Sequence, residues 1–207
     1  MIVHITMTND QFKKSNLCQE SFFIRLCLGL AHRVALLLHF GQTRRYGNRA
    51  VEHPMAVAHM VKPAGLLAQI IAILHDAIED APECLKWLAK LLVRMFGRKV
   101  QFGVYVLTNW TGDDRQYFQM IATCTKIMPV IAIVKLADKL HVITVPYGKT
   151  KRDEMQYFER TQQTFIPLME ECRLSITDKD GLSLFDEMLA ELTYKVSCQL
   201  QFLRNQP

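Results

Sequence analysis

Residues 72–80 read Ala72-Ile73-Leu74-His75-Asp76-Ala77-Ile78-Glu79-Asp80, an apolar helical stretch that ends in four ionisable side chains. Burying Asp76 without a partner would cost on the order of several kcal/mol, and a bound cation removes that cost. In a helix, residues four apart share a face, which pairs His75 with Glu79. The same spacing pairs Asp76 with Asp80. The stretch therefore predicts a helix that carries a metal site, with two further carboxylates one turn beyond the ligands.

The rest of the chain has the same helical character. Apolar residues recur at helical spacing almost everywhere, and no stretch shows the sustained apolar/polar alternation of a half-buried strand. Glycine and proline divide the pattern into about eight to ten helices. We therefore predict an all-α fold, a single-domain helical bundle. The expected helices are 16–40, 54–61, 65–78, 82–96, 98–108, 113–125, 129–143, 151–173 and 180–203.

Length and charge limit the organisation and the partners. The chain has 207 residues, half of them apolar, which suffices for one buried core but not for two ordinary domains and a linker. We expect one domain over residues 1–207, with its motifs at about 30–170 and an added helix at about 180–203. The net charge of +5 fits an anionic ligand such as a phosphorylated nucleotide. Basic and aromatic residues do not interleave, and zinc-finger spacing does not occur, so we expect no nucleic-acid partner.

Cysteine usage and hydropathy indicate the compartment. The six cysteines are scattered without a Cys-x-x-Cys pair and are typical of reduced core thiols, which predicts a cytoplasmic protein. The most apolar N-terminal stretch, residues 22–40, contains Arg25, His32 and Arg33, and no small-residue cleavage site precedes it. This argues against a signal peptide or a membrane span, and we expect no membrane partner. The sequence leaves the oligomeric state open.

Residues 131–141 also combine charged with apolar residues, because Asp138 interrupts a strongly apolar helical pattern. Lys135 lies three residues before it and His141 three after, so both can reach it. His53 stands at the start of another expected helix and offers a further imidazole. Two imidazoles and two carboxylates suit manganese, iron, magnesium or zinc. The predicted metal ligands are His53, His75, Asp76 and Asp138.

These segments resemble the HD superfamily of phosphohydrolases, and more narrowly the hydrolase domain of the Rel/Spo alarmone enzymes and their small stand-alone relatives. The resemblance rests on four motifs: His39-Phe40-Gly41-Gln42-Thr43-Arg44-Arg45, His53-Pro54, Leu74-His75-Asp76-Ala77-Ile78-Glu79-Asp80, and Val134-Lys135-Leu136-Ala137-Asp138-Lys139-Leu140-His141. Thr161 with Pro167-Leu168 matches more weakly. It implies an HD-type helical bundle and Mn²⁺ held by the four ligands named above. It also implies removal of pyrophosphate from the 3′ position of guanosine tetra- or pentaphosphate (ppGpp or pppGpp).

The resemblance further implies roles for individual side chains. The Glu79-Asp80 pair separates alarmone hydrolases from other HD proteins, and these two acids would orient or deprotonate the attacking water. Contacts to the base or the phosphates of the substrate would come from Arg44, Arg45, Lys139 and Thr144. Arginine suits a pyrophosphate group through bidentate contact.

The chain departs from the family pattern in the nucleotide pocket. Where the family usually continues Ser-Gly-Glu-Pro-Tyr after the arginines, this chain has residues 46–50, Tyr-Gly-Asn-Arg-Ala, and Val142 replaces an asparagine. These changes keep open a phosphohydrolase for another nucleotide, such as the 2′-phosphate of NADPH or a nucleoside monophosphate. An alternative of another class is a nucleotide-sensing module without turnover. Intact Glu79 and Asp80 favour an enzyme, because binding alone needs no general base.

Overall fold

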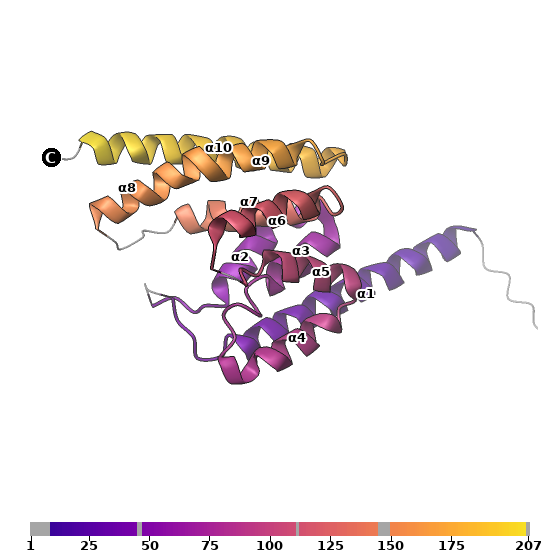
Figure 1. The fold of residues 1–207 in the computed structure, drawn as a ribbon. Helices are drawn as coiled ribbons and strands as arrows, with labels where there is room; N and C mark the ends of the chain where they lie inside the picture. Colours follow the sequence, from indigo (N-terminus) through magenta and orange to yellow (C-terminus); the bar gives the residue numbers. More distant parts are fainter. Residues whose placement is uncertain (1–8, 45–46, 111, 145–149, 206–207) are drawn as a thin grey trace, which may run out of the picture.

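The computed structural model describes residues 9–44, 47–110, 112–144 and 150–205, with side chains from residue 23 onward. In these ranges the elements are helices, which confirms the predicted all-α fold (Figure 1). The α-helices are α1 (Asn9–Leu38), α2 (Glu52–Met60), α3 (Gly65–Leu74), α4 (Lys86–Arg94), α5 (Arg98–Leu107), α6 (Asp114–Thr125), α7 (Val130–Ile143), α8 (Lys151–Arg160), α9 (Ile166–Arg173) and α10 (Lys179–Asn205). Short turns are η1 (Lys62–Ala64), η2 (Glu83–Leu85) and the π-helical η3 (Thr161–Phe165).

Three central helices carry the core. Helix α2 packs on α3, and α7 contacts both of them. Ile71 and Leu74 of α3 and Leu136 of α7 are fully buried among them. The long C-terminal helix α10 runs along α7, α8 and α9 and covers them on the outside (Figure 1). The core therefore holds α7 between α2 and α3 on one side and α10 on the other.

The predicted helix over 65–78 is wrong at its end, because α3 stops at Leu74 and residues 75–79 form turns. The Ala77 amide donates to the Leu74 carbonyl at 3.0 Å, which tightens the last turn, and the Asp80 amide donates to the Asp76 carbonyl at 2.9 Å. The bond between Asp80 and Asp76 nevertheless keeps one helical turn over these residues, and Asp76, Glu79 and Asp80 line the same cleft.

Two other predicted helices are interrupted. The segment 82–96 is not one helix: Pro82 has an extended backbone, η2 follows it, and α4 begins at Lys86. The segment 151–173 stays helical but contains the π turn η3 immediately before Pro167. A regular helix would place the proline ring against the carbonyl four residues earlier, and a wider turn relieves that clash. Helix α6 begins after Asp113, whose side chain accepts from the amides of Arg115 and Gln116.

Among the described residues, no single helix is long and apolar enough to cross a membrane. Helix α2 and the segment Lys62–Leu74 are together long and apolar enough to cross one, but they are bent by 65° relative to each other. Both arms of this pair contribute buried residues to the core, including Val57 and Ile71. The described cysteines Cys27, Cys84, Cys124, Cys172 and Cys198 are free thiols.

The packing of α10 generates a prediction about stability. Leu192 is fully buried, so Leu192→Ala should lower the free energy of unfolding by about 2–5 kcal/mol through lost contact and a cavity. Tyr194→Ala is the matched control on the same helix, because Tyr194 is 70% exposed; its effect should stay within about 0.5 kcal/mol. Urea unfolding followed by circular dichroism measures both variants. Equal losses would contradict the burial of this face of α10.

Candidate metal centre and cleft

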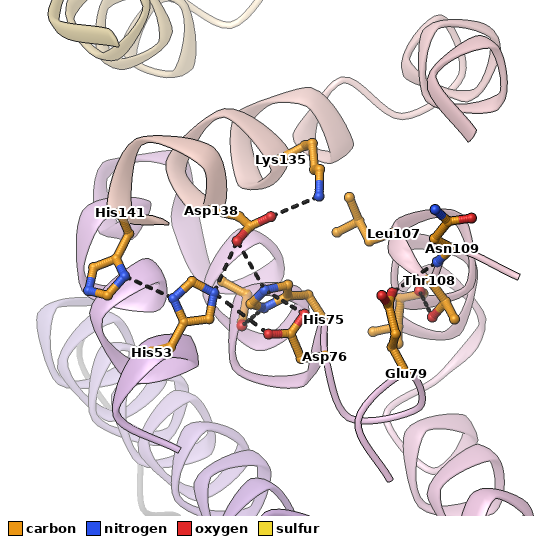
Figure 2. A network of polar contacts seen from close by, with 12 residues as sticks. His53, His75, Asp76, Glu79, Leu107, Thr108, Asn109, Lys135, Asp138 and His141 are labelled. Carbon is orange, nitrogen blue, oxygen red and sulfur yellow. Dashed lines mark hydrogen bonds and ion pairs between the residues drawn. The ribbon is translucent and has the colours of Figure 1, made fainter. Parts of the chain in front are cut away.

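Side chains from α2, from α7 and from the turn after α3 meet in one space (Figure 2). His53 Nε2 lies 3.0 Å from Asp138 Oδ1 and 3.6 Å from Asp76 Oδ2. His75 Nε2 lies 3.0 Å from Asp76 Oδ1 and 3.6 Å from Asp138 Oδ1. The structure thus brings together the four residues predicted as metal ligands, although up to 85 positions separate them in the chain.

The ring of His75 is oriented for a ligand. Its Nδ1 lies 2.8 Å from the carbonyl oxygen of Ala72 and must donate, because a carbonyl only accepts. In the neutral ring, Nε2 then carries the lone pair. This Nε2 is buried without a hydrogen bond although Asp76 is close. Metal-binding histidines commonly donate their other N–H in this way.

A divalent cation fits this donor set. One ligand atom each from His53, His75 and Asp138 lies within 4.8 Å of the others. The charges of the carboxylates act on the imidazoles even without a cation. Burial opposes protonation of His75, but Asp76 and Asp138 outweigh it and raise the pKa of His75 well above its usual value. The site therefore attracts positive charge, either a proton or a cation.

Lys135 forms an ion pair with the second carboxylate oxygen of Asp138. Its Nζ lies 2.8 Å from Asp138 Oδ2, which leaves Oδ1 facing the imidazoles. Burial opposes ionisation of Asp138, but the Lys135 ammonium outweighs it, so the pKa of Asp138 is well below its usual range. The ion pair confirms that Lys135 reaches Asp138, as the spacing predicted, and Lys135 also lines the cleft.

His141 contacts the back of His53. The two Nδ1 atoms are 2.8 Å apart, and the ring centroids are 4.8 Å apart (Figure 2). One of these nitrogens must donate and the other accept. His39, the other histidine that the sequence placed near the site, bonds to Gln42 instead, with His39 Nδ1 at 2.9 Å from the Gln42 amide oxygen.

Glu79 and Asp80 lie beside the cluster and line the same cleft. Glu79 Oε2 accepts from the backbone amide of Asn109 at 3.0 Å. Burial raises the pKa of Glu79, and the Asp76 charge adds to the effect. Burial and Asp76 likewise raise the pKa of Asp80. Both carboxyls are therefore better proton acceptors near neutral pH than exposed ones.

A cleft of about 540 Å³ leads away from the cluster. Arg44 lines it at the cluster end, with its guanidinium 3.7 Å from Asp76 Oδ2. Lys139 lies farther along, with Nζ 4.1 Å from the centre of the Tyr157 ring and 5.4 Å from that of Phe165. Burial, together with the Lys135 charge, lowers the pKa of Lys139 to about 8. The cleft thus combines carboxylates, cations and aromatic rings.

Among the described residues, one predicted substrate contact, Thr144, does not line the cleft. Thr144 caps α7, and its hydroxyl donates to the His141 carbonyl at 2.7 Å. Arg45 lies outside the described residues, as does Tyr46. The sequence reasoning missed several residues of the wall, and no motif marks them. They are Asn109, Tyr117, Tyr157, Arg160 and Phe165, whereas Thr161 was already part of the resemblance.

Comparisons with known proteins agree with this fold. No family model matches the chain. It is 26% identical over 210 aligned positions to a guanosine-3′,5′-bis(diphosphate) 3′-pyrophosphohydrolase of Borreliella burgdorferi, covering 94% of this chain and 30% of that protein. It is 31% identical over 147 positions to the bifunctional (p)ppGpp synthase/hydrolase SpoT of Escherichia coli, covering 67% of this chain and 20% of that protein. The chain thus spans less than a third of either relative.

A solved structure of a metazoan ortholog of SpoT superposes with a TM-score of 0.55 at 20% identity, over 79% of this chain and 94% of that one. The helical fold and the clustered histidines and aspartates define the HD class of domains. The similarity to the Borreliella and Escherichia proteins shows that the chain carries a Rel/Spo-type HD domain, as its motifs predicted.

The donor cluster predicts a metal-dependent gain in stability. Mn²⁺ in excess should raise the Tm, because a ligand at 100 times its Kd stabilises the folded state by about 2.7 kcal/mol. His75→Ala should lose most of this shift. Each variant is compared with and without metal, so its own stability cancels. His59→Ala is the control, since His59 is exposed on the same helix as His53. A full shift in His75→Ala would contradict the site.

Proposed function

We propose that this chain hydrolyses guanosine tetra- and pentaphosphate at the 3′-pyrophosphate and releases pyrophosphate. The supporting observation is that His53, His75, Asp76 and Asp138 converge at one end of a cleft that also holds two carboxyls with raised pKa values. The names of the Borreliella and Escherichia relatives support the choice of substrate. We further propose that residues 1–207 act as one domain in the cytoplasm, without a nucleic-acid partner.

The four converging residues would hold a divalent metal, and we propose Mn²⁺. When bound, such a cation supplies Lewis acidity, which lowers the pKa of water and polarises a phosphoryl oxygen. Other residues of the chain position the proposed ligands and set their charge. Lys135 keeps Asp138 ionised and fixes one of its oxygens at 2.8 Å. The Ala72 carbonyl fixes the ring of His75.

Glu79 and Asp80 are the proposed proton acceptors. Water adds its oxygen to the phosphorus attached to the 3′ oxygen, the bond between that phosphorus and the 3′ oxygen breaks, and the 3′ oxygen gains a proton. A carboxylate in this role works best when its pKa approaches the operating pH. Burial moves both acids in that direction. The Asn109 amide fixes Glu79 through Oε2 and leaves Oε1 for the proton.

The cations of the cleft would bind the phosphates of the substrate. Arg44 lies at the cluster end and Lys139 farther along, so both can meet anionic oxygens. We propose Arg45 and Thr144 as further contacts on the strength of the resemblance. Thr144 would have to release the His141 carbonyl, to which its hydroxyl is bonded.

We also propose His141 as a positioning residue for His53. For His53 Nε2 to present a lone pair, His53 Nδ1 must carry the proton and donate it to His141 Nδ1, 2.8 Å away. His141 would then fix both the tautomer and the orientation of the His53 ring. Such outer partners typically contribute 10- to 100-fold to metal affinity.

The proposed reaction can be tested with a panel of nucleotides. Purified protein with Mn²⁺ should release pyrophosphate from ppGpp faster than phosphate from NADPH or a nucleoside monophosphate, as measured by chromatography. Glu79→Gln and Asp80→Asn should lower kcat by about 10²- to 10⁴-fold and keep the metal-induced Tm shift. Glu83→Gln is the control, because Glu83 is exposed. Bound nucleotide without turnover of any substrate would favour the sensing module instead.

The role of His141 has its own test. His141→Ala should weaken Mn²⁺ affinity about 10- to 100-fold in calorimetric titration. His141→Asn should recover most of it, because the asparagine oxygen can accept where Nδ1 accepted. At saturating Mn²⁺ the kcat of both variants should approach that of the parent. Equal affinities of the alanine and asparagine variants would remove the positioning role and leave the proposed reaction untouched.

A further inference from the structure

One side of α4 leaves large apolar residues uncovered. Trp87, Leu91 and Met95 follow one another at intervals of four residues along one helical face, with exposed fractions of 65%, 52% and 67%. The other side of the helix packs into the fold through Ala89 and Val93, both fully buried. Two turns of α4 and the residue that follows it therefore present an apolar line to the outside.

Basic side chains surround this line. Residues 86–99 contain no aspartate or glutamate, but they contain Lys86, Lys90, Arg94, Arg98 and Lys99. The nearest acid in sequence, Glu83, is paired with Lys86 at 2.8 Å. The segment thus carries a strong positive excess next to exposed apolar atoms.

Both tryptophans of the chain belong to this surface. Lys90 Nζ lies 5.1 Å from the centre of the Trp110 ring, which places the turn after α5 beside α4. Trp110 is 47% exposed. Tryptophan is highly buried on average, and it is enriched where one part of the ring meets apolar atoms and another meets water. We call the group Trp87, Lys90, Leu91, Arg94, Met95, Arg98 and Trp110 the α4 surface.

We propose that the α4 surface docks on an anionic lipid bilayer. Helical faces that combine Lys and Arg with Trp and Leu bind in the interface of anionic membranes. A protein partner fits less well, because protein interfaces are depleted in lysine, and three of the five cations in residues 86–99 are lysines. The contact is peripheral and needs no spanning helix. It therefore replaces the sequence-based expectation of no membrane partner.

Intrinsic fluorescence provides a direct test, because both tryptophans lie on the α4 surface. The full chain is titrated with vesicles of phosphatidylcholine alone and of phosphatidylcholine mixed with phosphatidylserine. The proposal predicts that the tryptophan emission moves to shorter wavelength with the anionic vesicles and stays constant with the neutral ones. No shift with either kind of vesicle overturns it.

Charge reversal locates the contact. Arg94→Glu/Arg98→Glu leaves both fluorophores in place and should weaken binding at least about 25-fold, since each basic residue near an anionic membrane contributes about fivefold. The matched control Lys179→Glu/Lys195→Glu has the same change in net charge on α10, on the far side of the molecule in Figure 1. It should bind within about twofold of the parent.

Two results would overturn the assignment. Equal loss in both double variants would mean that net charge, and not the α4 surface, drives binding. Sedimentation as a dimer that Trp87→Ser dissociates would assign the surface to a second copy of the chain. Circular dichroism checks that each variant is folded. None of these measurements depends on the proposed hydrolysis.

Discussion

The ion pair of Asp138 with Lys135 is the constraint on which the centre of the molecule depends. A buried carboxylate is tolerated only with close partners, because its desolvation otherwise costs several kcal/mol by order of magnitude. Lys135 neutralises one oxygen at 2.8 Å, and the other faces His53 and His75 at 3.0 and 3.6 Å. These partners come from α7, α2 and the turn after α3. The interactions that neutralise Asp138 thus connect three elements of the fold.

Much of this arrangement could be predicted from the sequence, because apolar spacing indicates helices and charged residues within such spacing require partners. The four residues predicted as metal ligands followed from that reasoning and from the family resemblance. The turn after Leu74 did not, because Ala77 and Ile78 continue the apolar pattern that predicts a helix. The chain leaves the helix where the His75 ring bonds the Ala72 carbonyl and the Ala77 amide reaches back to Leu74. Local spacing contains no signal for those bonds.

The cleft-lining side chains of α8 and η3 could also not be predicted from the sequence. Tyr157 and Phe165 lie in a segment that reads as one regular helix, but Tyr157 precedes the π turn and Phe165 is its last residue. Thr161, the first residue of that turn, donates its hydroxyl to the Tyr157 carbonyl at 2.8 Å. A π turn shifts the residues that follow its start around the helix axis relative to a regular helix. The position of Phe165 therefore depends on a turn that apolar spacing does not reveal.

The departures from the family pattern fall where the structure can accept them. Val142 is only partly buried near the end of α7, and residues 47–50 belong to the segment that leads into α2, where Ala50 is buried. Replacing a side chain in a connecting segment seldom leaves a buried charge uncompensated. Replacing Asp138 would do so for Lys135, and replacing Lys135 would do so for Asp138. Electrostatics thus constrains the proposed metal end of the cleft more strongly than the segments in which this chain departs from the family pattern.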